Sequence, residues 1–267
     1  MTVNGARPGW TPDERIDPRW GRIARFWGVL VGVGLLAGAI LFLIESQGLL
    51  GAVPTYASTS AGQLQDEARY WVAFFAYRNA TMWDYLLRDG IFFVAFIGFI
   101  PLALAVNAAT GGRRALVQVT AGFLGVGALF GALNAVTFLV DTSWWRSTGW
   151  EQVPPEIMVA VGRGTELMDD LSSWCGTASA AAFAIGLYYL GKACLAEPAL
   201  PRRLAPVAFV GAALEAVLVL LVVLDLNGLD LVQTLLLIAT GVVIAPVIAI
   251  WLGVHLGRVL EAGSKHE

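Results

Sequence analysis

The sequence predicts an all-α fold, a polytopic membrane helix bundle with six transmembrane helices and an extracytoplasmic interfacial helix. Of its 267 residues, 57% are hydrophobic and only 14% are charged, whereas about 25% of the residues in a soluble domain are charged. The chain also contains six apolar stretches of about 20 residues, the length that crosses a bilayer as a helix. These observations argue against a soluble fold and predict a single integral membrane domain over residues 1–267.

The expected spans follow from the positions of these stretches. They cover residues 26–44, 90–110, 115–140, 171–191, 204–224 and 231–254. A helix that is apolar on every side is typical of a buried or membrane-spanning segment, and it has no periodic stripe to mark its ends. Pro101 and Pro246 lie inside the second and sixth spans. Because proline lacks a backbone N–H, we expect a kink in each of these helices.

The distribution of basic residues predicts which connections lie on which side of the membrane. Most of the 17 Lys and Arg residues fall before span one, between spans two and three, between spans four and five, or after span six: Arg7, Arg15, Arg19, Arg22, Arg25, Arg113, Arg114, Lys192, Arg202, Arg203, Arg258 and Lys265. The other connections hold Arg69, Arg78, Arg88, Arg146 and Arg163. Because cytoplasmic loops are enriched in Lys and Arg, we expect a multi-pass cell-membrane protein with cytoplasmic N- and C-termini.

Two long outer connections, residues 45–89 and 141–170, are rich in aromatic residues. The first is expected to be helical over residues 64–88, because Trp71 and Phe75 belong to an apolar stripe at helical spacing. Such a stripe is typical of an interfacial helix whose Trp and Tyr side chains lie at headgroup depth. The alternative is a lid over the bundle that gathers a ligand.

Pairs of glycine residues at a spacing of four predict close packing of the helices. These pairs are Gly28 with Gly32, Gly34 with Gly38, Gly127 with Gly131, and Gly253 with Gly257. In lipid, helices associate through small residues that let their backbones approach closely. The pattern fits contacts within the bundle and a dimer face equally well.

Glu215 is the one charged residue inside the expected spans. It lies about 16 Å along its helix from the inner end, and a carboxylate at that depth costs at least a few kcal/mol unless it faces protein or water. We expect it to accept or share a hydrogen bond with a neighbouring helix, where Thr240 lies at a similar depth. The alternative is a direct role with a substrate, an ion or a proton. Together with Asn134 of the third span, which either bridges helices or binds a ligand, these residues form the candidate ligand-binding site.

Glu166, Asp169 and Asp170 form a second candidate site on the outer side. Their spacings of three and four residues place them on one face of a helix, and carboxylate oxygens are ligands that Ca²⁺ and Mg²⁺ prefer. A divalent cation is therefore the one cofactor that the sequence suggests. The alternative is that these acids and the others at the outer span ends, such as Glu45 and Asp89, mark the outer boundary and pair with Arg78, Arg88, Arg146 or Arg163.

The layout of the chain resembles six-span bacterial membrane-protein families of uncharacterised activity. The resemblance depends on the arginine pairs that precede spans three and five and on the Leu-Pro-Arg-Arg-Leu segment at residues 200–204. It implies a place in the bacterial inner membrane, and it supplies no catalytic residues.

The sequence contains no catalytic motif, so the leading interpretation is a non-enzymatic integral membrane protein. We expect it to bind a lipid or hydrophobic ligand near Glu215, or to act as an accessory to a partner complex. The alternatives are a membrane-embedded, metal-dependent enzyme acting on a lipid at the outer face, and a small cation- or proton-coupled transporter. Membrane lipids are the expected partners, with a homo-oligomer or membrane complex as a further possibility. The nearly balanced net charge of −3 gives no support for nucleic acid.

Overall fold

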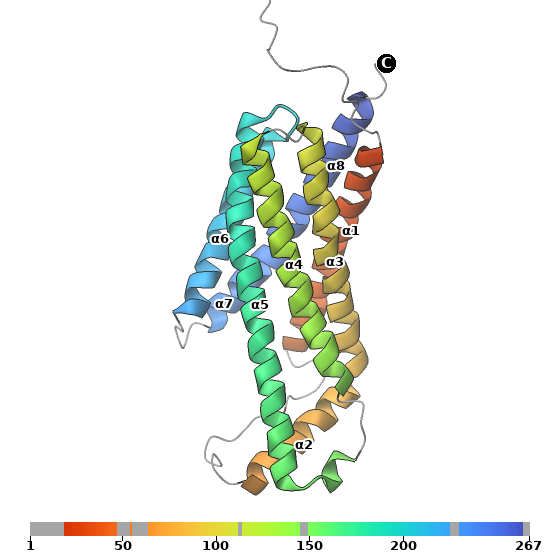
Figure 1. Ribbon diagram of the computed structural model, residues 1–267, viewed down its shortest axis with the longest axis vertical. Helices are drawn as coiled ribbons and strands as arrows, with labels where there is room; N and C mark the ends of the chain where they lie inside the picture. The colour runs from red at the N-terminus through yellow and green to blue at the C-terminus, as the bar shows by residue number, and fades with distance from the viewer. Residues whose placement is uncertain are drawn as a thin grey trace, which may run out of the picture.

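The computed structural model describes residues 19–46, 54, 64–111, 114–144, 149–224 and 230–263. Within them every regular element is helical (Figure 1). In chain order the elements are α1 (Arg19–Ser46), α2 (Leu64–Ala80), α3 (Met82–Ala109), α4 (Ala115–Trp144), the 3-10 turn η2 (Trp150–Gln152), α5 (Pro155–Ala196), the 3-10 turn η3 (Arg202–Leu204), α6 (Ala205–Val223), α7 (Asp230–Ile238), the π-helix η4 (Ala239–Ile244) and α8 (Ala245–Gly263).

In the described part of the chain, six helical segments are long and apolar enough to cross a membrane, which confirms the predicted number. The last of them is built from α7, η4 and α8 in series. The start of α1 and the end of α8 lie at the same end of the bundle (Figure 1), where Arg25 forms an ion pair of 2.8 Å with Glu261. We call this the proximal end, and the opposite end, where α1 finishes and α3 begins, the distal end.

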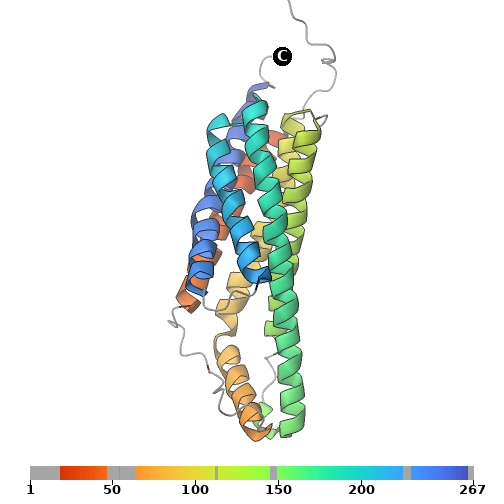
Figure 2. The same cartoon turned by 90° about the vertical axis from the view of Figure 1, so that its left-hand side faces the viewer.

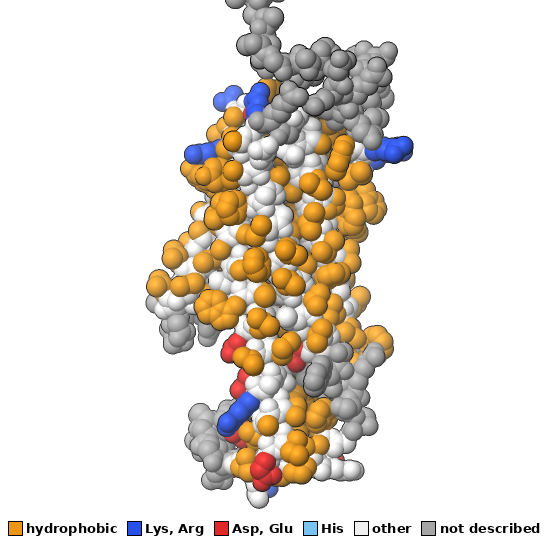
Figure 3. Space-filling view, in the orientation of Figure 1, with side chains coloured by type: hydrophobic (Ala, Val, Ile, Leu, Met, Phe, Trp, Pro, Cys, Tyr) orange, Lys and Arg blue, Asp and Glu red, His pale blue; other side chains and the backbone are white. Residues whose placement is uncertain are grey.

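The surface charges agree with a membrane-crossing bundle. The face drawn in Figure 3 has a broad belt of apolar side chains without charged ones, Lys and Arg at the proximal end, and mostly Asp and Glu at the distal end. Five of the basic residues used above, Arg7, Arg15, Arg113, Arg146 and Lys265, lie outside the described residues. The figure places the charge-free belt between two charged ends, as a bilayer requires.

The six segments form a ring in which neighbours pack in the order α1, α3, α4, α5, α6 and α7–η4–α8, with α8 returning to α1. The α1–α8 contact is a backbone contact, since a Cβ added to Gly28 would lie 2.6 Å from the Ala249 carbonyl oxygen and from the Gly253 Cα. Gly34 likewise faces α3 at Ala95. These glycines therefore serve contacts within the bundle, which is one of the two alternatives that the glycine pairs allowed. The least extensive contact in the ring lies between α6 and the α7–η4–α8 segment.

The helix α5 extends far beyond the bundle at the distal end (Figures 1 and 2). Its 42 residues would be about 63 Å long at 1.5 Å per residue, twice the thickness of a bilayer core. The sequence predicted a span only from residue 171, whereas the helix begins at Pro155. Most of the connection 141–170 is thus helical, and α3 likewise begins at Met82, inside the expected connection 45–89.

The predicted helix in the first outer connection exists as α2, but its apolar stripe packs on protein. Trp71 and Phe75 are buried in a small second core with Met158 and Val159 of α5. Gly162 makes this contact close, because a Cβ there would overlap the Trp71 indole ring. The stripe is therefore covered by α5, and an interfacial helix at the membrane surface is not confirmed.

Candidate functional site

The distal half of the bundle encloses a cavity of about 620 Å³. Its lining comes from the distal halves of α1, α3, α4 and α6, from the middle of α5, from α7, η4 and the start of α8, and from Arg78 of α2. Toward the proximal end the bundle is filled by completely buried side chains, among them Leu102, Val106, Leu190 and Leu256. The cavity is thus closed toward the termini and reaches the charged groups at the distal end. We call it the distal cavity.

Phenylalanine rings form most of the aromatic lining of the distal cavity: Phe42, Phe92, Phe96, Phe99, Phe138 and Phe183. The Phe183 ring centre lies 5.1 Å from that of Phe99 and 6.2 Å from that of Phe96. Glycines of α4 give these rings room, since a Cβ on Gly131 would overlap Phe96 and one on Gly127 would lie 3.0 Å from Phe183. The wall is therefore apolar and closely supported from behind.

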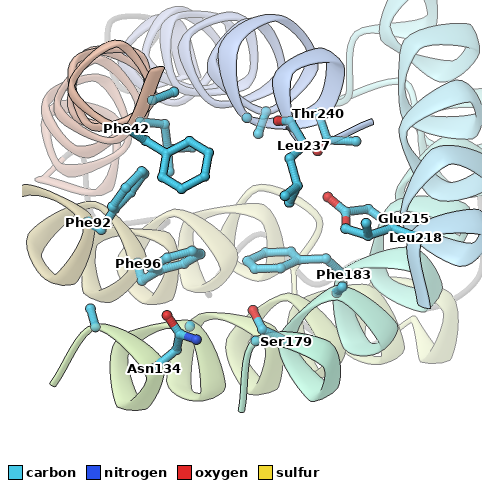
Figure 4. Close-up of a pocket in the computed structure, with 18 of the residues that line it drawn as sticks. Phe42, Phe92, Phe96, Asn134, Ser179, Phe183, Glu215, Leu218, Leu237 and Thr240 are labelled. Carbon is cyan, nitrogen blue, oxygen red and sulfur yellow. Dashed lines mark hydrogen bonds between the residues drawn. The ribbon is translucent and has the colours of Figure 1, made fainter. Parts of the chain in front are cut away.

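Glu215 extends from α6 into this cavity, with its carboxylate directed toward the space between Phe183 and Leu237 (Figure 4). Protein surrounds the carboxylate on most sides, and because the residue lines the cavity, its remaining accessible surface faces that space. No hydrogen bond or ion pair joins Glu215 to any other described residue. An unpaired carboxyl group in an apolar wall costs free energy.

Thr240 lines the same cavity, but it does not form the expected hydrogen bond with Glu215. Its hydroxyl donates to the backbone carbonyl of Leu236 at 2.9 Å and approaches that of Leu237 at 3.4 Å. A threonine in a helix commonly satisfies its hydroxyl in this way, on its own preceding turn. The expected hydrogen bond between the two residues was therefore wrong, although both side chains lie at the cavity.

The backbone at Thr240 is a π-helix, which the sequence analysis did not predict. The N–H of Ala245 donates to the carbonyl of Thr240, five residues earlier, and Pro246 follows with no N–H of its own. Thr240, Gly241 and Val242 from this widened turn all line the cavity. Single π turns inside α-helices frequently occur at functional sites.

Asn134 also lines the distal cavity, and its side chain bridges α4 and α5. Its Nδ2 donates to the backbone carbonyl of Ser172 at 2.6 Å. Ser179 makes a similar bridge, with Oγ donating to the Gly127 carbonyl at 2.8 Å. The helix-bridging alternative for Asn134 is thus confirmed. The three candidate residues Glu215, Thr240 and Asn134 surround one cavity, and only Glu215 lacks a protein partner.

A buried group of charges closes the distal end of the cavity. Arg88 is 7% exposed and Asp89 is 3% exposed; Arg88 Nε donates to Asp89 Oδ1 at 2.7 Å, and its Nη1 pairs with Glu45. The pairing of outer acids with arginines is therefore confirmed for Glu45 and Asp89. Removing one member of such a buried pair leaves an uncompensated charge, so these residues fix the ends of α1 and α3 relative to each other.

A second arginine, Arg78 of α2, continues this group. Its guanidinium carbon lies 4.0 Å from the centre of the Tyr85 ring, and that of Arg88 lies 4.8 Å from the same centre. Arg78 also interacts electrostatically with Asp141 and Asp169. Each of the two arginines thus has two carboxylates around it, and the cation–π contacts place the tyrosine between them.

The outer carboxylates do not come together as a metal site. Glu166 and Asp170 are exposed on α5, whereas Asp169 turns toward Arg78 and is only partly accessible. Among the described residues no group of three or more His, Cys, Asp or Glu side chains is placed to hold a metal ion. The metal site therefore remains a prediction that this geometry does not support.

The cavity lies behind the weakest contact of the ring. Near the middle of α6 the contact with the last segment is close, since a Cβ on Gly211 would lie 2.9 Å from Ile244 Cγ2. Farther toward the distal end, Leu218 and Val222 of α6 face Gln233 and Leu237 of α7 across the cavity. We call this boundary the α6–α7 seam.

Comparison with protein families, with curated proteins and with solved structures finds no match for this chain. Its function is therefore inferred from the cavity itself. Sequence reasoning identified Glu215 from its depth in an apolar span, but it missed the phenylalanine wall. The phenylalanines come from four helices, and single apolar residues in a span carry no signal that separates a cavity from lipid or core.

Proposed function

We propose that the protein is a multi-pass membrane protein that binds a lipid or another hydrophobic small molecule in the distal cavity. The observation that supports this most directly is a largely apolar cavity of about 620 Å³ with an unpaired carboxyl group in its wall. Sites for small molecules are typically cavities of about 300–1,000 Å³, lined by apolar and aromatic groups with a few polar ones. The distal cavity has this size and composition.

The charges support an orientation in the membrane. Lys and Arg are concentrated at the proximal end, and the positive-inside tendency therefore favours cytoplasmic termini with the distal end outside. The cavity would then lie at the depth of the outer leaflet. A hydrophobic molecule in that leaflet could enter sideways through the α6–α7 seam, without its apolar part crossing water.

A substitution at Gly241 tests ligand binding in the cavity. This glycine lines the cavity, and a Cβ there would meet no atom within 4 Å, so Gly241→Phe should fill part of the space. Gly122 in α4 also has open space around its Cβ position, but it does not line the cavity. Gly122→Phe is therefore the matched control for the added volume.

The measurement is native mass spectrometry of each protein after gentle extraction. The parent chain and Gly122→Phe should retain a bound small molecule, and Gly241→Phe should lose it. Equal occupancy in all three proteins would place the bound molecule elsewhere, and no bound molecule in the parent chain would oppose the proposal.

A further inference from the structure

The chemistry around Glu215 narrows the class of ligand. Its carboxyl group is about 12 Å along α6 from the distal end of that helix. The side chains drawn around it in Figure 4 are Phe183, Leu218, Leu237 and Thr240, and the one hydroxyl among them already donates within its own helix. None of these side chains thus pairs with the carboxyl group, and a molecule bound in the cavity would lie beside it.

The charges of the cavity favour a positive partner. Three carboxyl groups, of Glu45, Asp89 and Glu215, line it together with two guanidinium groups, of Arg78 and Arg88. Arg88 is paired with Glu45 and Asp89, and the neighbours of Arg78 include two more carboxylates. Among the residues that the structure describes, no Lys, Arg or His lines the cavity at the depth of Glu215. A phosphate beside Glu215 would therefore meet an acid and no base, whereas a cation would meet its counter-charge.

The aromatic wall provides a second attraction for a cation. The faces of phenylalanine rings carry negative electrostatic potential, which attracts a cation within about 6 Å of the face, more strongly where water is excluded. Phe183 lies beside Glu215, and Phe96 lies next to Phe183 (Figure 4). A carboxylate and aromatic rings around one apolar space suit a positive centre with hydrophobic substituents.

We infer that the ligand of the distal cavity is a lipophilic cation, an amine or onium centre that binds at Glu215 and packs its hydrophobic groups against the phenylalanines. This inference rests on the proposed ligand-binding function, and it adds the charge of the ligand. A positive centre with hydrophobic groups is found both in compact cations that enter the site from water and in single-chain amines that reside in the membrane.

Two ions of nearly the same shape and opposite charge test the inference. Tetraphenylphosphonium and tetraphenylborate are compared by equilibrium dialysis with the purified protein, and protein-free micelles of the same detergent are the blank for partitioning. We expect the phosphonium to bind at least ten times more tightly than the borate. Equal binding, or tighter binding of the borate, would overturn the cationic ligand but leave a hydrophobic ligand in place. If neither probe binds and no small molecule co-purifies with the protein, both proposals fail; a co-purified neutral or anionic molecule would overturn the cation alone.

Variants at Glu215 separate the carboxylate from the rest of the cavity. Glu215→Gln preserves the shape of the side chain and should weaken phosphonium binding at least tenfold while leaving borate binding unchanged or stronger. Glu156→Gln removes one exposed carboxylate of α5 outside the cavity and should change neither affinity. Melting of each variant is recorded to show that it is folded. Unchanged phosphonium binding in a folded Glu215→Gln protein would refute the assigned contact.

A further variant tests the aromatic wall, and a competitor identifies the source of the cation. Phe183→Leu preserves apolar volume without the ring, and it should weaken phosphonium binding several-fold but not borate binding. Equal weakening of both probes would oppose a cation–π contact. Hexadecylamine should displace the phosphonium: displacement below its micellar concentration indicates a membrane amine, whereas displacement only by compact cations indicates a water-borne ligand. Failure of every cationic competitor to displace the probe would count against the site.

Discussion

Replacing Glu215 by leucine should stabilise the protein. The carboxyl group has no hydrogen-bond or ion-pair partner among the described residues, so the substitution leaves nothing else unpaired. Mutational data put the cost of burying an unpaired polar group at about 1–3 kcal/mol. Leucine is close in size, and its methyl groups would contact Phe183, Leu218 and Leu237, which surround the carboxylate in Figure 4.

We therefore expect the free energy of unfolding of Glu215→Leu to rise by about 1–3 kcal/mol. The sequence alone predicts the opposite sign, because it places a hydrogen-bonding partner on a neighbouring helix that would be left unpaired. Glu215→Gln keeps a polar group in the same place and should change stability little. Glu197, buried and paired with Arg114 at the proximal end, is the contrasting case, and Glu197→Leu should destabilise the bundle.

Reversible unfolding in mixed micelles of a mild detergent and dodecyl sulfate, followed by circular dichroism, measures these differences. The ligand must first be removed, because a bound molecule would add to the stability of the parent protein by mass action. A fall of about 1 kcal/mol or more for Glu215→Leu would mean that the carboxyl group has a partner in the protein. The inference that this carboxyl group pairs with a bound ligand would then be refuted.

Three further predictions concern packing, the charged group and orientation. Gly28→Val should lower the free energy of unfolding by at least about 1–3 kcal/mol, because the backbone of Gly253 occupies the space of the new side chain. Gly122→Val is the control and should change the free energy of unfolding little, because the space around its Cβ position is open. Equal effects of the two substitutions would contradict the close contact. Arg88→Met should cost about 3–5 kcal/mol by leaving two acids without their buried partner, and a neutral result in the same unfolding assay would show that water replaces it. Glu156→Cys, in a chain without its other cysteines, should react with an impermeant maleimide in intact cells; reaction only after permeabilisation would reverse the proposed orientation.

The number of spans could be predicted from the sequence because it depends on composition alone. A stretch of about 20 apolar residues has few alternatives to crossing a bilayer. The distal helix ends could not be predicted in the same way, since α5 continues as a helix through Arg163, Glu166 and Asp170. Charged residues end an apolar stretch without ending a helix, because they are good or acceptable helix formers on an exposed face.

The candidate site was predictable in part for a related reason. A carboxyl group deep in an apolar span has a high free-energy cost whatever its surroundings, so Glu215 can be identified as a candidate from the sequence. Its partner is not, because a hydroxyl such as that of Thr240 can satisfy itself on its own helix. The cavity is the sum of ring positions from several helices, which depends on the rotation of each helix in the bundle.

The position of α2 shows how one apolar stripe can serve two environments. The spacing of Trp71 and Phe75 specifies a helix with one apolar face, and a membrane surface and a protein surface are both able to cover that face. In this protein the apolar face of α2 is covered by α5. The extension of α5 beyond the bundle packs Met158 and Val159 against that face and places Gly162 in close contact with the indole ring of Trp71. Because α2 carries Arg78, packing on α5 also holds that guanidinium beside Tyr85 at the end of the distal cavity. The extension of α5 thus positions part of the charged end of the cavity, which links an element outside the apolar belt to the proposed site.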